Sequence, residues 1–172
     1  METSVTEDEE KRYAELQQLA LKAARVGDTS LLASMIDAGL PVNLTDEKGN
    51  TLLMLASYHG HLDAVRVLLE FKADPEIRND NGQSPIAGAA FKGDLPMVQL
   101  LVENGANVEG ASADGRTALM MAAMFNRTEI VDYLLSKGAN PHVQDARGVT
   151  PLAAAQTMGA VDTAEQLSKL NG

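Results

Sequence analysis

The sequence predicts an all-α protein built from repeated pairs of short helices, and three observations support this fold class. A Gly-x-Thr or Gly-x-Ser motif returns every 33 residues without insertion or deletion, beginning at Gly49, Gly82, Gly115 and Gly148. Apolar residues within each unit recur at helical spacing. The chain is 45% apolar but only 3% aromatic, so small and aliphatic residues must fill its interior. A fixed period of this length is typical of stacked units that cannot bury their apolar faces alone.

The unit that starts at Asp46 shows the plan of each repeat. Residues 46–50 have the composition of a turn. Thr51 supplies a hydroxyl that caps an inner helix from Leu52 to about His59. Gly60 follows and ends that helix, because glycine readily adopts a positive φ.

An outer helix is predicted next, from about Leu62 to about Phe71. Its apolar residues Val65, Leu68 and Leu69 share one face with Leu62, as expected for a helix that packs on a neighbour.

The other units vary this plan at the helix ends. Pro85 and Pro151 stand at the first helical position, where proline loses no hydrogen bond. Asp94 is predicted to cap an outer helix. Asn126 replaces the glycine that ends an inner helix, and asparagine tolerates the left-handed conformation better than most residues.

Both ends of the chain are predicted to cap the stack. Residues 1–12 form an acidic segment that leads into a capping helix. Thr6 to Glu9 resemble a capping box, which predicts a helix that starts there and continues through Ala24. The last outer helix, from about Val161 to about Leu170, is more polar and is expected to close the other end.

These motifs resemble the ankyrin repeat. The family pattern runs D-x-x-G-x-T-P-L-H-x-A-A, then G-H, then an outer helix with V and L-L, then G-A-D. Asp46, Gly49, Thr51, Ala56 and the pair Gly60-His61 match it, and the same register recurs in the other units. The resemblance implies an ankyrin repeat solenoid of about five 33-residue helix-turn-helix units with short β-hairpin turns. The domain would cover residues 13–172, with repeats near 13–45, 46–78, 79–111, 112–144 and 145–172.

One departure from the family pattern concerns the contacts between repeats. The histidine of T-P-L-H is replaced by Met54, Ala87, Met120 and Ala153. The usual threonine–histidine hydrogen bonds between repeats are therefore absent, and we expect packing to replace them. The methionines in place of histidine also resemble small ankyrin proteins of bacteria.

Composition excludes several classes of function. The 24 acidic residues against 14 Lys and Arg give a net charge of −10, which disfavours nucleic acid and anionic membranes. No cysteine is present. The chain shows no signal peptide and no apolar run of the roughly 18 residues that cross a bilayer. We therefore expect a cytoplasmic monomer whose partner is another protein.

The candidate binding residues occupy two positions of each repeat. In the resembled family the end of the inner helix faces a concave groove, and exposed aromatic and methionine residues beside cations are typical of binding hot spots. The alternative is that these side chains only seal the helix ends. The pairs at this position are Arg25-Val26, Tyr58-His59, Phe91-Lys92, Met124-Phe125 and Thr157-Met158, and the binding candidates among them are Tyr58, His59, Phe91, Lys92, Met124 and Phe125.

The hairpin tips are expected to add polar specificity through cations, with ordinary solvated turn residues as the alternative. Asp46 and Asp145 are expected to brace their turns rather than to contact a partner. The tip cations are Lys48, Arg78, Arg116 and Arg147.

No motif predicts catalysis or a bound cofactor. Nucleotide-binding loops and nucleophile motifs are absent, and His59, His61 and His142 have no accompanying cluster of carboxylates. Asn43 stands at the hairpin asparagine of the family, and Glu76, Glu109 and His142 take that position in later repeats. We expect no cofactor, no metal site and no enzymatic activity.

The predicted function is therefore a protein–protein adaptor or inhibitor that binds its partner on the concave face. A rigid surface that is formed before binding loses little entropy. The alternative is an assembly or stability factor for one enzyme or subunit, which would bind through the acidic outer surface and the N-terminal segment.

Overall fold

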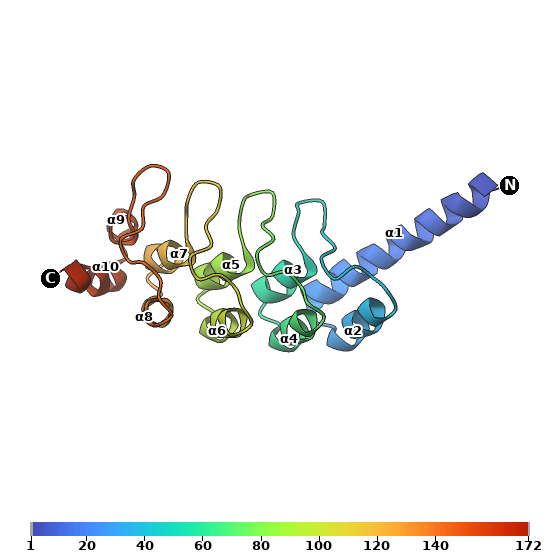
Figure 1. The fold of residues 1–172 in the computed structure, drawn as a ribbon, viewed down its shortest axis with the longest axis horizontal. Helices are drawn as coiled ribbons and strands as arrows, with labels where there is room; N and C mark the ends of the chain where they lie inside the picture. Colours follow the sequence, from blue (N-terminus) through green and yellow to red (C-terminus); the bar gives the residue numbers. More distant parts are fainter. Residues whose placement is uncertain (1, 172) are drawn as a thin grey trace. The chain divides into compact units, whose positions relative to one another are not determined.

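The computed structural model describes the backbone of residues 2–171 and the side chains of residues 6–170. The chain divides into two compact units, with the division between Asp74 and Pro75. Both units consist of helices and turns, and Figure 1 shows the helices labelled in chain order. No helix of the described chain is long and apolar enough to cross a membrane.

The first unit contains four helices. The inner helices α1 and α3 contact each other, as do the outer helices α2 and α4, and each inner helix contacts the outer helix that follows it. In Figure 1 the first half of α1 extends away from the other three helices of this unit. The helices are α1 (Glu2–Val26), α2 (Thr29–Asp37), α3 (Leu52–Tyr58) and α4 (Leu62–Glu70).

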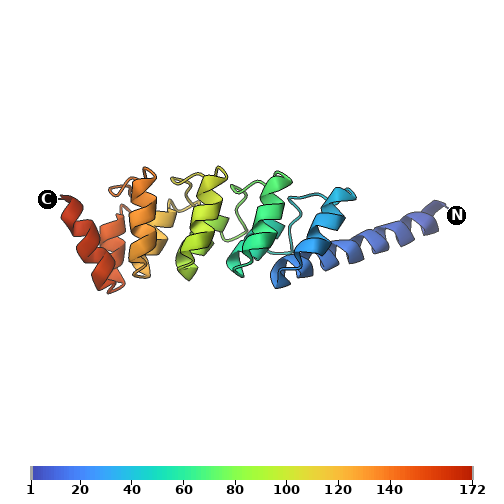
Figure 2. The ribbon, with the colours of Figure 1, turned by 90° about the horizontal axis from the view of Figure 1, so that it is seen from below.

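The second unit repeats the arrangement three times. Inner helices α5, α7 and α9 form one layer and outer helices α6 and α8 a second, as Figures 1 and 2 show. The helix α10 contacts both α8 and α9. The elements are α5 (Pro85–Lys92), α6 (Leu95–Glu103), α7 (Ala118–Met124), α8 (Thr128–Ser136), α9 (Pro151–Thr157), α10 (Val161–Ser168) and a final 3₁₀ turn, η1 (Lys169–Asn171).

The inner helices start as the sequence predicts. The hydroxyl oxygens of Thr51, Ser84, Thr117 and Thr150 accept hydrogen bonds from backbone N–H groups at 3.0, 3.3, 3.3 and 3.1 Å. Each acceptor satisfies one of the N–H groups that the first turn of a helix leaves unpaired. The predicted N-caps are therefore confirmed.

The predicted ends of the inner helices are confirmed too. Gly60 and Gly93 adopt φ values of 80° and 76°, and Asn126 adopts 62°. A side chain at Gly93 would also meet the guanidinium of Arg127, at 2.9 Å from the position of the added Cβ. Gly93 therefore satisfies both the backbone conformation and the close approach of the next repeat.

The turns that precede the inner helices are nearly identical. In each, the N–H of the first residue donates to the carbonyl of the fifth at 2.9 Å, and these pairs are Asp46–Asn50, Asn79–Gln83, Ser112–Arg116 and Asp145–Val149. Isolated antiparallel bridges join Thr45 to Thr51 and Ala111 to Thr117. The short hairpins are confirmed.

The interior is built from aliphatic and small side chains, as the composition predicts. Leu32 and Leu68 are fully buried in the first unit, and Leu101, Leu134 and Met120 are buried in the second. Buried alanines such as Ala89 and Ala122 on the inner helices permit close contact between neighbouring repeats.

The predicted start of the first helix is wrong. The helix α1 begins at Glu2, four residues before Thr6, so Thr6 lies inside the helix and is not its cap. Glutamate is a good helix former, so Glu7, Glu9 and Glu10 favour a chain that stays helical through this segment instead of starting at a capping box.

Candidate functional site

A hollow in the second unit lies between the inner helices α7 and α9. Its volume is about 260 Å³. Three methionines are among its lining residues, and of these Met158 is 50% exposed whereas Met120 is only 1% exposed. This α7–α9 hollow is lined by Arg116, Met120, Met124, Asp145, Arg147, Val149, Ala154, Thr157 and Met158.

Charged groups stand around the methionines of the α7–α9 hollow. Asp145 accepts hydrogen bonds from the N–H groups of Arg147 and Val149, at 2.8 and 3.0 Å. The hydrogen bond from Val149 is the main reason why the pKa of Asp145 is lowered, and the nearby charges of Arg147 and Arg116 act in the same direction. The carboxylate is thus ionised at neutral pH and already paired with its own turn, as predicted for a bracing residue.

The guanidinium groups of Arg116 and Arg147 at this site are less strongly paired than the carboxylate of Asp145. Arg116 Nε lies 3.4 Å from Asp114 Oδ2, on the exposed surface. The side chain of Arg147 forms no ion pair within the described part of the chain. Both cations are therefore available to a ligand at the rim of the α7–α9 hollow.

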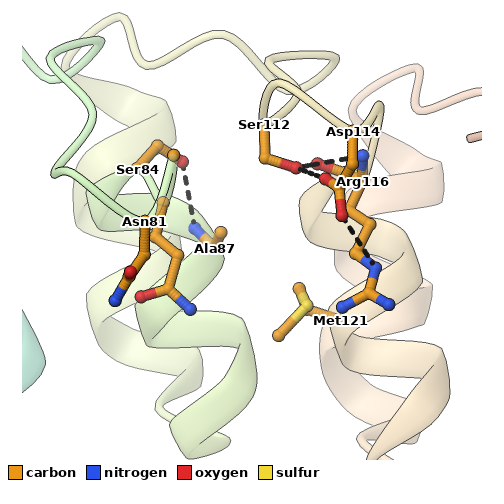
Figure 3. A pocket seen from close by; sticks show the side chains of 9 residues that line it. Asn81, Ser84, Ala87, Ser112, Asp114, Arg116 and Met121 are labelled. Atoms are coloured by element: carbon orange, nitrogen blue, oxygen red, sulfur yellow. Dashed lines mark hydrogen bonds and ion pairs between the residues drawn. The ribbon is translucent and has the colours of Figure 1, made fainter. Parts of the chain in front are cut away.

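A smaller and more polar pocket of about 80 Å³ lies between α5 and α7. Figure 3 shows it, with Asn81 on one side and Ser112, Asp114 and Arg116 on the other. Ser112 stands where the other turns carry Asp or Asn, and its hydroxyl donates to Asp114. This hydrogen bond is the main cause that lowers the pKa of Asp114. Arg116 lines both hollows and therefore connects them.

The aromatic residues predicted in this unit form a pair. The rings of Phe91 and Phe125 meet edge to face, with centroids 4.8 Å apart, and both residues are half-buried. Such a pair stabilises the contact between neighbouring repeats. Met124, beside Phe125, lines the α7–α9 hollow, and Lys92 is exposed at the end of α5. The structure therefore brings Phe91 and Phe125 together but gives them a packing role as well as exposure.

The predicted residues of the first unit lie near the end of α3 and at the preceding turn. Tyr58 is 37% exposed and its ring meets that of His59 edge to face, at 5.6 Å between centroids. His61 Nε2 lies 2.8 Å from the carbonyl oxygen of Arg25. Lys48 is exposed in the turn that Asp46 braces through the Lys48 N–H, at 2.9 Å.

The hairpin position of Asn43 connects successive repeats. Asn43 Oδ1 accepts from the N–H of Asp74 at 2.9 Å in the first unit. In the second unit Glu76 and Glu109 accept in the same way, at 2.7 and 2.8 Å, from residues that also lie 31 positions later. Arg78, two residues after Glu76, is exposed. Glutamate at this position is thus a structural equivalent of the asparagine.

Sequence reasoning missed parts of this site. Met120 was interpreted only as a packing substitute for the family histidine, yet it also lines the α7–α9 hollow. Met158 stands at the predicted helix-end position of the last repeat but was not named as a binding candidate. The signal that could have found the hollow is that Met120 and Met124 lie one turn apart on one inner helix and that Met158 directly follows the next inner helix.

The comparisons with known proteins agree with this architecture. The family model described as ankyrin repeats in three copies matches residues 20–112 and residues 88–172. The two matches together cover most of the chain, which therefore belongs to the ankyrin repeat family. Ankyrin repeats are protein–protein interaction modules and are generally not catalytic.

Relatives come from bacteria and animals. The ankyrin repeat protein PA3287 of Pseudomonas aeruginosa is 60% identical over 44 residues, which is 26% of this chain and 26% of that protein. Human ankyrin repeat domain-containing protein 63 is 52% identical over 42 residues, 24% of this chain and 11% of that protein. Human oxysterol-binding protein-related protein 1 is 38% identical over 75 residues, 42% of this chain and 8% of that protein. The chain thus matches about a quarter or less of each of these relatives.

Proposed function

We propose that this protein is a non-catalytic adaptor or inhibitor that binds a partner protein with the second unit, through the surface formed by the inner helices and the turns. The observation that carries the proposal is the α7–α9 hollow, where exposed methionine stands beside two weakly engaged guanidinium groups. Apolar pockets with arginine at the rim are typical of protein-binding hot spots.

Phe91, Lys92 and Phe125 extend this proposed surface beyond the hollow, and Arg78 would contribute a further cation. Because Phe91 and Phe125 pack on each other, their truncation would lower stability as well as affinity. They are therefore poor probes of binding. Met158 is the better probe because it is half exposed.

The test is a pull-down with purified wild-type protein and two variants, followed by mass spectrometry. Met158→Glu replaces an apolar lining residue by a carboxylate, which can itself occupy Arg116 or Arg147, and it should remove the partner, with affinity lowered by about tenfold or more. Val161→Glu is the matched control, because Val161 is 69% exposed on α10 and does not line the hollow. A partner that binds Met158→Glu as well as it binds the wild type would contradict the proposal.

A second candidate function is an assembly or stability factor that binds through the N-terminal part of the first unit. The favouring observation is that Tyr13, Leu16 and Leu19 on α1 are 41–45% exposed, among acidic residues. Tyr58, His59 and Lys48 are exposed in the same unit, but the sequence predicts them as contacts of the adaptor and not of this alternative. This alternative would be favoured if the Leu16→Glu variant lost the partner protein and the Met158→Glu variant still bound it.

A further inference from the structure

We propose that the α7–α9 hollow receives one large apolar side chain, such as leucine, methionine or phenylalanine, from a partner segment that carries a carboxylate directly beside it. This inference rests on the proposed function and adds the chemistry of the partner to it. Three properties of the hollow carry the inference, namely its volume, its methionine wall and the charges at its rim.

The volume favours a side chain over a small-molecule ligand. Pockets for cofactors and drug-sized ligands usually have about 300–1,000 Å³. The α7–α9 hollow has about 260 Å³ and lies below that range. A cavity of this size matches an anchor side chain of a protein, which is the form that hot-spot contacts usually take.

The wall favours a large and apolar anchor without selecting one shape. Met120, Met124 and Met158 carry unbranched thioether side chains that adjust to different occupants. Ala154 leaves room between them because its side chain is a single methyl group. Leucine, methionine and phenylalanine should therefore bind, whereas alanine would leave the methionines in contact with water.

The rim favours a carboxylate next to the anchor. The lining holds Arg116, Arg147 and one carboxylate, Asp145, of which Oδ1 accepts from two backbone N–H groups. Asp114 lies 3.4 Å from Arg116 Nε, so Arg147 is the lining cation for which the described residues supply no ion pair. The whole chain has a net charge of −10, so an exposed guanidinium without an ion pair is a local feature of this surface. A guanidinium holds a carboxylate through two parallel hydrogen bonds, which adds orientation to the apolar contact.

The experiment selects binders from a display library of random 12-residue peptides against the full chain. We expect the enriched sequences to share a large apolar residue with Asp or Glu within two positions of it. A synthetic peptide with the consensus should then bind about fivefold more weakly, or worse, when its acid is replaced by glutamine or its apolar residue by alanine.

Variants of the protein test whether Arg116 and Arg147 bind the acidic residue of the peptide. Arg116→Gln with Arg147→Gln should weaken the consensus peptide by about tenfold and should remove its preference for acid over glutamine. Lys169→Gln is the control, because it removes an exposed cation that does not line the hollow. Thermal melting of each variant shows that a lost affinity does not come from unfolding.

The outcomes separate this inference from the proposed function. A basic consensus, or an acidic one that binds the double variant unchanged, would overturn the inference. A library that yields no enriched sequence would overturn it too, because multivalent display retains even weak binders. The proposed function would survive these results if Met158→Glu still released the partner protein, and would fail only if it did not.

Discussion

At the scale of single residues, the four turns share one hydrogen-bond pattern, but the side-chain group that accepts the hydrogen bonds differs between them. Asp46 and Asp145 accept two backbone N–H groups through one carboxylate oxygen, and Asn79 accepts the equivalent pair through its amide oxygen, both at 3.0 Å. Ser112 holds the same position with a hydroxyl group. Its oxygen accepts from the N–H of Arg116, and its hydroxyl donates to Asp114. The turn therefore requires an acceptor at this position and does not require a charge.

This comparison leads to a prediction about pH. In Asp145→Asn the acceptor stays but its charge is lost, as in the natural Asn79 turn. The pKa of Asp145 is lowered from 3.8 in the folded protein, so its stabilising contribution is complete above that value and is lost as the pH falls through the lower folded value. Asp145→Asn should therefore be slightly less stable than the wild type at pH 7, and the difference should shrink below about pH 4.

The measurement is thermal melting between pH 7 and pH 3 for the wild type, Asp145→Asn and the reverse substitution Asn79→Asp. Asn79→Asp is expected to gain stability at neutral pH and to lose the gain in acid. A stability difference for Asp145→Asn that does not change with pH would show that the charge of this carboxylate contributes nothing to the turn.

Residues that follow the inner helices replace the hydrogen bonds of the missing family histidine. Arg127 donates to the carbonyl of Phe91 at 3.1 Å, and the buried hydroxyl of Thr163 donates to that of Ala123 at 2.6 Å. Asn126 Oδ1 accepts from the first turn of α10, at 3.0 Å from the Asp162 and Thr163 nitrogens. Packing alone was predicted to replace the histidine, and that prediction is incomplete, because distinct polar groups also connect the repeats.

At the scale of elements, α1 combines two different halves. Ala20, Ala23 and Ala24 are buried against the rest of the first unit, whereas residues 6–16 are exposed on all sides. A helix of this length without tertiary contacts is only marginally stable in water. The first half of α1 should therefore be helical only because it continues the packed second half of the same helix.

Truncation of the first half of α1 tests this dependence. Removal of residues 2–12 should reduce the helical circular dichroism signal but shift the melting temperature by less than about 2 °C, because residues 6–12, whose side chains the structure describes, are all exposed. Ala24→Asp, in the buried half, is the contrasting variant and should lower the melting temperature strongly. A shift of more than roughly 5 °C on truncation would mean that the exposed half has a partner within the folded protein.

At the scale of the whole molecule, the repeats stabilise one another because none has a core of its own. Leu101 on α6 is fully buried in the second unit, where α6 contacts both α5 and α8. Its loss should therefore affect more than one repeat, as expected for units that are stabilised mainly by their interfaces.

The corresponding prediction is that Leu101→Asp destabilises the second unit by about 4 kcal/mol or more, from a lost core side chain and a buried unpaired charge. Chemical denaturation followed by circular dichroism measures it. Val161→Asp is the matched control, because the same change at an exposed position should be nearly neutral. Equal midpoints for the two variants would show that the outer helices do not pack through the predicted apolar face.

Much of the fold could be predicted because its determinants are local in the sequence. The caps Thr51, Ser84, Thr117 and Thr150 act on N–H groups three residues away, and the conformation of Asn126 follows from the same period that places Gly60 and Gly93. The start of α1 could not be predicted in this way, because the capping motif at Thr6 competes with a longer helical run and gave the wrong boundary.

The candidate site was less predictable than the fold. Phe91, Phe125 and Met124 were placed at helix ends by the period, but the period does not state which side chains contact each other. The α7–α9 hollow depends on side chains from two inner helices and the turn at Asp145, which are brought together only by packing. The predicted binding roles of Tyr58, His59, Lys48, Arg78 and Lys92 stay predictions.

The sequence by itself determined the repeat length, the helix caps, the turns and the aliphatic interior, because each depends on residues a few positions apart or on composition. Only the tertiary structure decided that Glu76 and Glu109 connect repeats and that Asn126 caps a helix 36 residues later. It also decided that Met120, Met124 and Met158 line one hollow beside Arg116 and Arg147. Hydrogen bonds and cavities of this kind depend on distances between side chains of different repeats, and a sequence period does not specify those distances.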